Sequence, residues 1–304
     1  MPQWDIISSK KFNITTEFDQ LTHVVVGTAR GYHRAPGRVE IVNATQQITF
    51  NTAGHPDSEQ LDSEFSQFRS VLEEYGVQVY HPVLAPDSVQ DQTCPRDIGF
   101  IIADTLVISN MKNQSRQKEF EGIRHLIAQW EGRIVLIPES IYLEGGDVVV
   151  DRHRIFIGSG QRSDIEAADF IKKNFDKDFD IIPIACKSAL DGEDILHLDC
   201  VFNILGLGHV LIYPEAFVSI PGIIQDDYSW IEVTKSEASA FATNVFSINP
   251  NTIVVRRHPE CARVNTILKE LGYHIIELAF DSVPSIGGSL RSVTLPLRRI
   301  EIKK

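Results

Sequence analysis

The residues of this 304-residue chain that are best suited to chemistry begin with two acidic turns, each just before an apolar run. Asp97 follows an arginine in one turn, whereas Glu144 and Asp147 flank a pair of glycines in the other. Paired glycines indicate a tight turn or a backbone that lies close to a ligand. Each turn, taken singly, also fits an ordinary solvated loop.

A histidine and a small nucleophile position complete the set. His197 and Asp199 lie within residues 196–202, and if that segment is a strand, both side chains point to the same side of it. Such a pair also fits a structural hydrogen bond or half of a metal site. Further along the chain, two glycines precede Ser289 and Ser292, an arrangement that suits a nucleophile platform or a plain loop.

Together these groups favour chemistry on a flat cation. Several carboxylates that face one pocket suit a guanidinium group, which donates paired charge-assisted hydrogen bonds in a fixed fork. Attack on the carbon of that cation needs a polarisable nucleophile and a group that carries a proton to the departing nitrogen. This chemistry requires residues far apart in the chain to converge, so the elements that carry them decide the interpretation.

The apolar runs occur as hairpins separated by segments with helical spacing. The expected hairpins are residues 98–109, 147–158, 200–213 and 245–256, and a fifth unit joins the strand at 23–27 to one near 294–297. Helical spacing covers residues 63–75, 117–130, 164–175 and 260–271, and short β-rich runs follow at 77–80, 134–137, 181–184 and 274–278. The pattern is a repeated ββαβ cycle.

Five cycles of about 50 residues predict a ring of units. The equivalent points of the cycles are Asp97, Asp147, Asp199, Asn244 and Ser292. A unit of this size cannot bury its own apolar face, so neighbouring units must stack, and five in a ring bring their equivalent strand starts to one axis. An open α/β sheet with evenly spaced elements is the alternative, and the polar residues at the equivalent points favour the ring.

Composition excludes several classes of protein. With 43% hydrophobic and 23% charged residues the chain is typical of globular proteins, and we expect a single domain over residues 1–304. A net charge of -12 opposes nucleic-acid binding. The four cysteines have neither the density of a disulfide scaffold nor the spacing of a zinc site. No apolar run suffices to cross a membrane and residues 1–11 do not resemble a secretory signal, so we expect a cytoplasmic location.

The sequence resembles the pentein superfamily of guanidine-modifying enzymes over nearly its whole length. Residues 17–27 are similar to the opening strand of amidinotransferases, and residues 95–97 resemble an Arg-Asp motif whose carboxylate grips the guanidinium. Residues 144–147 resemble a motif of arginine deiminases and dimethylargininases, and residues 157–163 are similar to a deiminase segment. Residues 197–199 resemble the general acid/base with its guanidinium-binding aspartate.

This resemblance implies a five-bladed α/β propeller, with five ββαβ units around a pseudo-fivefold axis. The implied catalytic residues are Ser292 at the nucleophile position, His197 as proton shuttle, Glu144 as its support, and Asp199. The implied substrate-binding residues are Asp97, Asp147, Asp199, Arg162, Gly288 and Arg291, with Arg162 meeting a substrate carboxylate. No metal or cofactor is implied. The expected partner is a small arginine-like guanidine, and a homodimer or higher homo-oligomer is left open.

Position 292 departs from the family pattern. Residues 287–294 align with the family's Gly-Gly-x-x-x-Cys-x-Thr, but Ser292 occupies the cysteine position, and none of the four cysteines lies near this motif along the chain. In the family the thiolate attacks the guanidinium carbon and forms a covalent thiouronium. A serine hydroxyl is hardly ionised at neutral pH, unlike a cysteine beside a protonated histidine. We therefore expect a chain that binds a guanidine and turns it over negligibly.

Several functions remain open at this stage. A Cys→Ser exchange that traps substrate and a natural, non-catalytic binding homologue both explain Ser292, and the retained acid/base favours the exchange. Hydrolysis of an arginine-like guanidine is the leading function. Amidinotransfer to an amine is the first alternative, because residues 17–27 and 197–206 resemble that branch. A dinucleotide site is the weakest interpretation, because residues 158–160 and 206–208 lack the third glycine.

Overall fold

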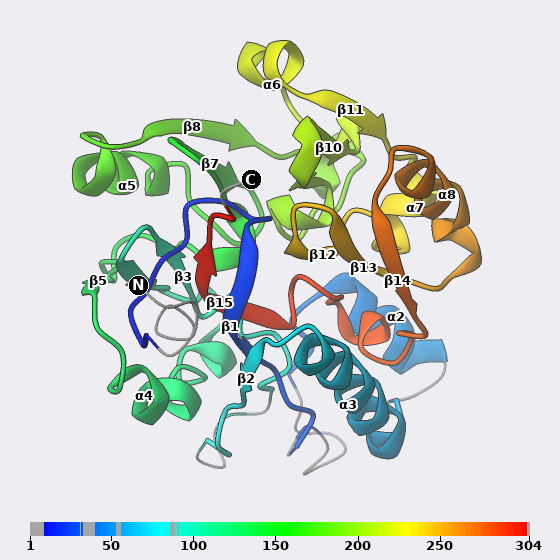
Figure 1. Cartoon of the computed structure of the whole chain (residues 1–304), viewed down its shortest axis with the longest axis horizontal. Helices are drawn as coiled ribbons and strands as arrows, with labels where there is room; N and C mark the ends of the chain where they lie inside the picture. Colours follow the sequence, from blue (N-terminus) through cyan, green and yellow to red (C-terminus); the bar gives the residue numbers. More distant parts are fainter. Residues whose placement is uncertain are drawn as a thin grey trace.

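Five three-stranded sheets make up the β-structure of the described residues, which in this computed structural model are 9–30, 32, 40–52, 56–85, 89 and 91–302. In every sheet the middle strand pairs antiparallel with one neighbour and parallel with the other. Figure 1 shows the sheets spread around the middle of the molecule, with the longer helices on the outside. Residues 1–8, part of the segment that does not resemble a secretory signal, lie outside the described residues.

The sheets follow one another along the chain. The first two are β3 (Gly99–Ile102), β4 (Thr105–Ile108) and β5 (Arg133–Leu136), then β6 (Val148–Asp151), β7 (Arg154–Ser159) and β8 (Asp180–Ala185). The next two are β9 (Phe202–Ile204), β10 (His209–Ile212) and β11 (Ser229–Glu232), then β12 (Phe246–Asn249), β13 (Thr252–Arg256) and β14 (His274–Leu278). The fifth combines β15 (Thr294–Ile300) with β1 (Gln20–Val26) and β2 (Gln78–Tyr80).

A helix leads into the parallel edge strand of each sheet. These helices are α3 (Ser58–Glu74), α4 (Glu121–Ile127), α5 (Ala167–Phe175), α6 (Gly222–Asp227) and α8 (Ala262–Glu270), whereas α2 (Ala44–Thr52) precedes α3 and α7 (Lys235–Ser239) follows β11. The helix α3 begins after Asp57, whose carboxylate accepts a backbone N–H of the first turn. Its buried residues Leu61, Phe65, Phe68 and Leu72 recur at helical spacing, so one face packs on the core.

Apolar clusters fill the space between neighbouring sheets. One cluster joins β3 and β4 to β6 and β7, and a second joins these last two strands to β9, β10 and β13. A third joins β12 and β13 to β1, and a fourth joins β1 and β15 to β3 and β4. Val24 and Val26 belong to one cluster and Val25 to another, because successive side chains of a strand point to opposite faces. Both faces of these short strands are therefore buried.

The structure confirms the four predicted hairpins and the joining of the first strand to the last in a fifth unit. It also adds the helices α2, α6 and α7 and the strand β11, which the predicted cycles did not include. The expectation of a strand over residues 196–202 is wrong, because Leu198–Cys200 forms a 3-10 turn and β9 begins only at Phe202. The Leu198 N–H, which a strand would need for its ladder, is bound instead by the Asp147 carboxylate.

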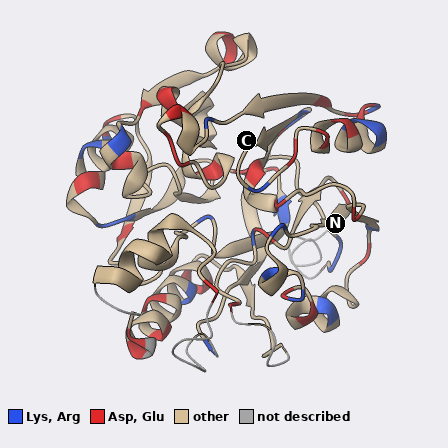
Figure 2. Cartoon of the chain, turned by 180° about the vertical axis from the view of Figure 1, so that it is seen from behind, with Lys and Arg blue, Asp and Glu red and all other residues tan. Residues whose placement is uncertain are grey.

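Charged residues are distributed over the outer elements. Figure 2 shows Lys and Arg interspersed with Asp and Glu on the helices seen from that side, rather than gathered in a basic stripe of the kind that nucleic-acid-binding proteins carry. Among the described residues, no helix combines the length and the apolar character that crossing a bilayer demands.

Candidate active site

The five equivalent residues of the cycles stand just before the first strand of their sheets. Asp97 precedes β3, Asp147 precedes β6, Asp199 precedes β9, Asn244 precedes β12 and Ser292 precedes β15. All five are buried, although each carries a polar side chain. Buried polar groups need partners in the protein or a ligand, so the hydrogen bonds of each group indicate its task.

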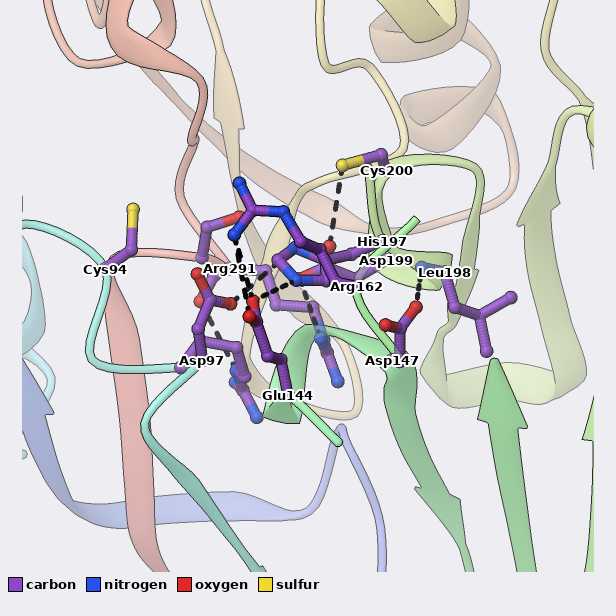
Figure 3. A network of polar contacts seen from close by, with 12 residues as sticks. Cys94, Asp97, Glu144, Asp147, Arg162, His197, Leu198, Asp199, Cys200 and Arg291 are labelled. Atoms are coloured by element: carbon purple, nitrogen blue, oxygen red, sulfur yellow. Dashed lines mark hydrogen bonds and ion pairs between the residues drawn. The ribbon is translucent and has the colours of Figure 1, made fainter. Parts of the chain in front are cut away.

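His197 lies between two carboxylates (Figure 3). Its Nε2 is 2.8 Å from Glu144 Oε2, and its Nδ1 is 3.8 Å from Asp97 Oδ1. The side chains of His197, Glu144 and Asp97 are only 3%, 0% and 5% exposed. The fold therefore brings together three residues, separated along the chain, that the sequence had indicated as chemical groups.

The imidazole of His197 is held in its protonated form. Burial alone would lower its pKa, but the charge of Asp97 and the hydrogen bond and charge of Glu144, aided by Asp147, raise the pKa to about 9. For Glu144, in contrast, burial acts to raise the pKa, but the hydrogen bond and charge of His197 outweigh burial and leave the pKa at about 2. At neutral pH the pair is an imidazolium and a carboxylate, so His197 has a proton to give.

Asp97 is only half satisfied by the protein. Its Oδ2 accepts a hydrogen bond of 2.8 Å from Arg116 Nη1, whereas its buried Oδ1 accepts no hydrogen bond from any described residue. The Arg116 guanidinium also binds Glu119 through two contacts of 2.7 and 2.9 Å. Arg116 lies in no recognisable motif, so sequence reasoning missed it. A buried carboxylate oxygen without a donor in the protein is an acceptor suited to a cationic ligand.

Asp199 is oriented by a buried arginine. Its Oδ2 lies 2.9 Å from Arg291 Nη1, and Arg291 Nη2 is bound 3.0 Å away by Glu17 and 2.8 Å away by the carbonyl of Val148. Arg291 is 1% exposed, and its guanidinium is thus directed into the protein network. Sequence reasoning missed Glu17, although it begins the segment 17–27 that resembles an amidinotransferase strand. The contact of Asp199 Oδ1 is a weak one, the Cys200 thiol at 3.7 Å.

Asp147 is fully engaged with its neighbours. Its Oδ1 accepts the Leu198 N–H at 2.7 Å, and its Oδ2 accepts the hydroxyl of Ser163 at 2.6 Å. Burial raises the pKa of Asp147, while the charge of His197 and these hydrogen bonds lower it, and the balance is about 6. Arg162, next to Ser163, contacts both oxygens of Glu144 at 3.5 Å and donates to the carbonyl of Val42.

Ser292 lies against Asn244 and Gly288. The Asn244 side-chain oxygen accepts the backbone N–H of Ser292 at 3.1 Å and its hydroxyl at 3.3 Å. A Cβ atom on Gly288 would lie 3.4 Å from Ser292 Cβ and 2.7 Å from the sulfur of Cys94. The fold therefore places Cys94 beside the Gly-Gly motif, although the two are far apart along the chain.

The cysteines of the described chain are kept as neutral thiols. Burial, followed by the charges of nearby aspartates, raises the pKa of Cys94 and of Cys200 well above the ordinary value. Burial also raises the pKa of Cys186, and that of Cys261 to about 11. None of these thiols is thus ionised near neutral pH, as an attacking thiolate would have to be.

A cavity of about 450 Å³ opens next to the segment that carries His197 and Asp199. It is lined by Leu196 and Cys200, the chain neighbours of His197 and Asp199, and by Gly287 and the helix α2. One donor atom each from Asp97, Glu144 and His197 lies within 4.8 Å of the others, so these described residues could hold a metal ion. The guanidinium groups of Arg116 and Arg162 bind the two carboxylates, and this positive charge opposes a divalent cation there.

Comparisons with known proteins place the chain in a family. The model of the family described as N,N dimethylarginine dimethylhydrolase, eukaryotic, matches residues 39–299. The chain is 33% identical over 266 residues to the uncharacterized protein YkgA of Bacillus subtilis (strain 168), a match that covers 86% of this chain and 88% of that protein. It is 23% identical over 341 residues to a putative inosamine-phosphate amidinotransferase 2 of Streptomyces griseus, covering 94% and 96% of the two chains.

Solved structures share the fold. An inosamine-phosphate amidinotransferase from Streptomyces griseus matches with a TM-score of 0.79 and 18% identity over 96% of this chain and 98% of that one. The N-terminal domain of ArgZ, a cyanobacterial arginine dihydrolase, matches as a cysteine-to-serine mutant bound to substrate with a TM-score of 0.78 and 19% identity, over 91% and 98% of the chains.

Proposed function

The chain belongs to the N,N-dimethylarginine dimethylhydrolase family of the pentein superfamily, and from this membership we propose that its site binds and processes an arginine-like guanidine by hydrolysis. Members of this group are guanidine-modifying hydrolases or amidinotransferases. We also infer that the chain is a single catalytic domain, in which the five sheets close into a propeller around a pseudo-fivefold axis. The four apolar clusters that link neighbouring sheets, including the last to the first, support that closure.

One observation carries the proposal. The Oδ1 atom of Asp97 is buried, has no hydrogen-bond donor among the described residues, and lies beside the protonated His197. A guanidinium N–H would satisfy this oxygen, and the weakly bound Oδ1 of Asp199 offers a second acceptor. Both aspartates are held by internal arginines through their other oxygen, so they are oriented before a ligand arrives.

The remaining groups fit the steps of the reaction. A thiolate at position 292 would form a bond to the guanidinium carbon, and ammonia or an amine would leave with a proton from His197. Glu144 would hold the ring of His197 in place. The neutral imidazole would then take a proton from water, which would attack the covalent thiouronium and release the ureido product and the thiolate. Arg162, close to Glu144, would turn to a substrate carboxylate. Arg291, Asp147 and Gly288 would shape the site around the cation.

Ser292 interrupts this sequence at its first step. Its hydroxyl donates to Asn244, and no described neighbour ionises it, so the serine protein is expected to hold the guanidine without forming the thiouronium. The substrate-bound cysteine-to-serine form of ArgZ supports the idea that a serine exchange retains a ligand in this fold. A natural binding homologue is the second candidate, because it explains the same serine.

Amidinotransfer is the alternative chemistry. An amine in place of water would attack the thiouronium and leave with the amidino group. The likeness of the chain to a putative inosamine-phosphate amidinotransferase supports this candidate, and the cavity beside Cys200 offers space for an acceptor. The identity of the second nucleophile, water or an amine, separates the two functions.

Restoring the nucleophile tests the proposal. Ser292→Cys protein is incubated with arginine, methylated arginines, agmatine and guanidino acids, with and without ornithine or glycine, and the products are identified by mass spectrometry. We expect turnover by Ser292→Cys and none by the serine protein or Ser292→Ala. A ureido product indicates hydrolysis, whereas an amidinated amine indicates transfer.

Ligand binding by the serine protein is measured with the same compounds by calorimetry. A Ser292→Cys protein that folds and stays inert, while the serine protein binds a guanidine, would favour the non-catalytic homologue. A serine protein that binds no guanidine at all would refute the proposal.

A further inference from the structure

Asp147 and Ser163 connect the two sides of the Glu144–His197 pair. The Ser163 hydroxyl oxygen accepts the Glu144 N–H at 3.1 Å and donates to Asp147 Oδ2 at 2.6 Å. The other oxygen of Asp147 accepts the Leu198 N–H at 2.7 Å. A continuous chain of three hydrogen bonds therefore runs from the main chain of Glu144 to the main chain next to His197, and both linking side chains are at least nine-tenths buried.

The two bound N–H groups are those that set the position of the pair. The Leu198 N–H belongs to the peptide unit that follows His197, so holding it fixes the main chain from which the imidazole projects. The Glu144 N–H fixes the main chain that carries the carboxylate. Figure 3 shows Asp147 directed to Leu198 on one side of the polar network, while Glu144 is directed to His197.

The segment that carries Ser163 is itself tied to the segment that carries Glu144. The N–H of Tyr142 donates to Asp164 Oδ2 at 2.8 Å, and the N–H of Asp164 donates to the Tyr142 carbonyl at 2.9 Å. Ser163 adds a third bond next to these two. The hydroxyl thus lies on a rigid support, as a group that positions a catalytic pair requires.

Close packing leaves these groups little freedom. A Cβ atom on Gly158 would lie 2.7 Å from Asp147 Oδ1, and one on Gly146 would lie 2.7 Å from His197 Cγ. Two glycines therefore permit the approach of Asp147 to Leu198 and of His197 to Glu144. Both oxygens of Asp147 already accept a hydrogen bond within the protein, unlike Oδ1 of Asp97.

We propose that Asp147 and Ser163 are positioning residues, which hold Glu144 and His197 at hydrogen-bond distance from each other. In this proposal Asp147 acts through His197 and does not touch the guanidine. The consequence for catalysis rests on the proposed function, whereas the effect on His197 does not.

The test follows the protonation of His197 by nuclear magnetic resonance of the imidazole nitrogens, with the signal assigned by its loss in His197→Gln. Ser163 makes no hydrogen bond or ion pair with His197 in the described structure, so a change at Ser163 reaches the ring through the two groups that it binds, Glu144 and Asp147. We expect Ser163→Ala to lower the pKa of His197 by about one unit, since the Glu144 carboxylate is no longer held against it. Ser163→Thr, which keeps the hydroxyl, is expected to retain the original value.

Ser247→Ala is the matched control, because it removes the hydroxyl of another buried serine, on β12. A His197 titration that is unchanged in Ser163→Ala, or that shifts equally in Ser247→Ala, would overturn the proposal. Should Ser163→Ala fail to fold, Ser163→Cys keeps the volume and weakens the hydrogen bonds, with the same expectation. Because the titration needs no ligand, a protein that binds no guanidine would refute the proposed function without changing this result.

Discussion

Asp97 uses only one of its two carboxylate oxygens in hydrogen bonds with the described residues. One oxygen is bound by Arg116 and the other has no donor among the described residues. We expect Asp97→Asn to raise the dissociation constant for a guanidine about 10- to 100-fold, because a charge-assisted hydrogen bond is lost. Calorimetry on the folded variant measures it.

The control for this change is Asp104→Asn, which neutralises an exposed aspartate in the turn between β3 and β4. It removes the same charge from the molecule and is expected to leave the affinity unaltered. Equal weakening by both variants would show a long-range charge effect, and an unaffected Asp97→Asn protein would exclude Asp97 as a ligand contact.

The sequence indicated which residues carry the chemical groups of the site, but not which residues bind those groups. Asp97, Glu144 and His197 could be singled out because each sits in a short motif before a strand. Arg116 could not, because nothing in its local sequence indicates that it binds Asp97. Glu17 contacts Arg291 across 274 positions of the chain, and only the folded structure brings such residues together.

The turn Gly145–Asp147 sets the spacing of the site at the level of elements. Gly146 has no room for a side chain, because a Cβ atom would lie 2.7 Å from the ring of His197 and 2.9 Å from Asp97 Oδ1. We expect Gly146→Ala to displace the ring, to cost about 1–3 kcal/mol of the free energy of unfolding, and to abolish guanidine binding. Denaturant unfolding and calorimetry measure the two effects.

Gly222→Ala provides the comparison, because a Cβ atom at this glycine, at the start of α6, meets no described atom within 4 Å. It is expected to keep both stability and binding close to the values of the unchanged protein. If Gly146→Ala behaved in the same way, the turn would not constrain His197 as the structure indicates.

Elements with strong periodicity were predictable, and the weaker ones were not. The hairpins combine continuous apolar runs with turn residues, and the structure keeps them because both faces of each strand are buried. The helix α6 has six residues, less than two turns, and β11 has only two apolar residues among its four, so neither gives a clear signal. The turn Leu198–Cys200 resembled a strand in sequence. It could not be predicted as a turn, because the Asp147 carboxylate that binds the Leu198 N–H lies 51 residues away along the chain.

At the scale of the whole molecule, Glu17 joins three parts of the fold. It precedes β1, it accepts the N–H of Val150 in β6 at 3.3 Å, and it pairs with Arg291, which precedes β15. Arg96, before β3, approaches it at 3.9 Å. Buried charges of this kind stabilise a fold only as a set, because removal of one member leaves the others desolvated and unpaired.

Glu17→Gln is therefore expected to cost roughly 3 kcal/mol of the free energy of unfolding at neutral pH. Burial acts to raise the pKa of Glu17, but the charges of Arg291 and Arg96 outweigh it and leave the pKa at about 2, below the ordinary 4.5. A depressed pKa means that this stabilisation is fully present above pH 4.5 and is lost as the pH falls through about 2.

The difference in stability between the unchanged protein and Glu17→Gln should consequently shrink as the pH is lowered from about 7 toward about 2, and urea unfolding over that interval measures it. Glu74→Gln, which neutralises an exposed glutamate at the end of α3, should match the unchanged protein throughout. A difference that stayed constant with pH would mean that Glu17 contributes through packing and not through its charge, and the buried ion network could not then be what ties the sheets together.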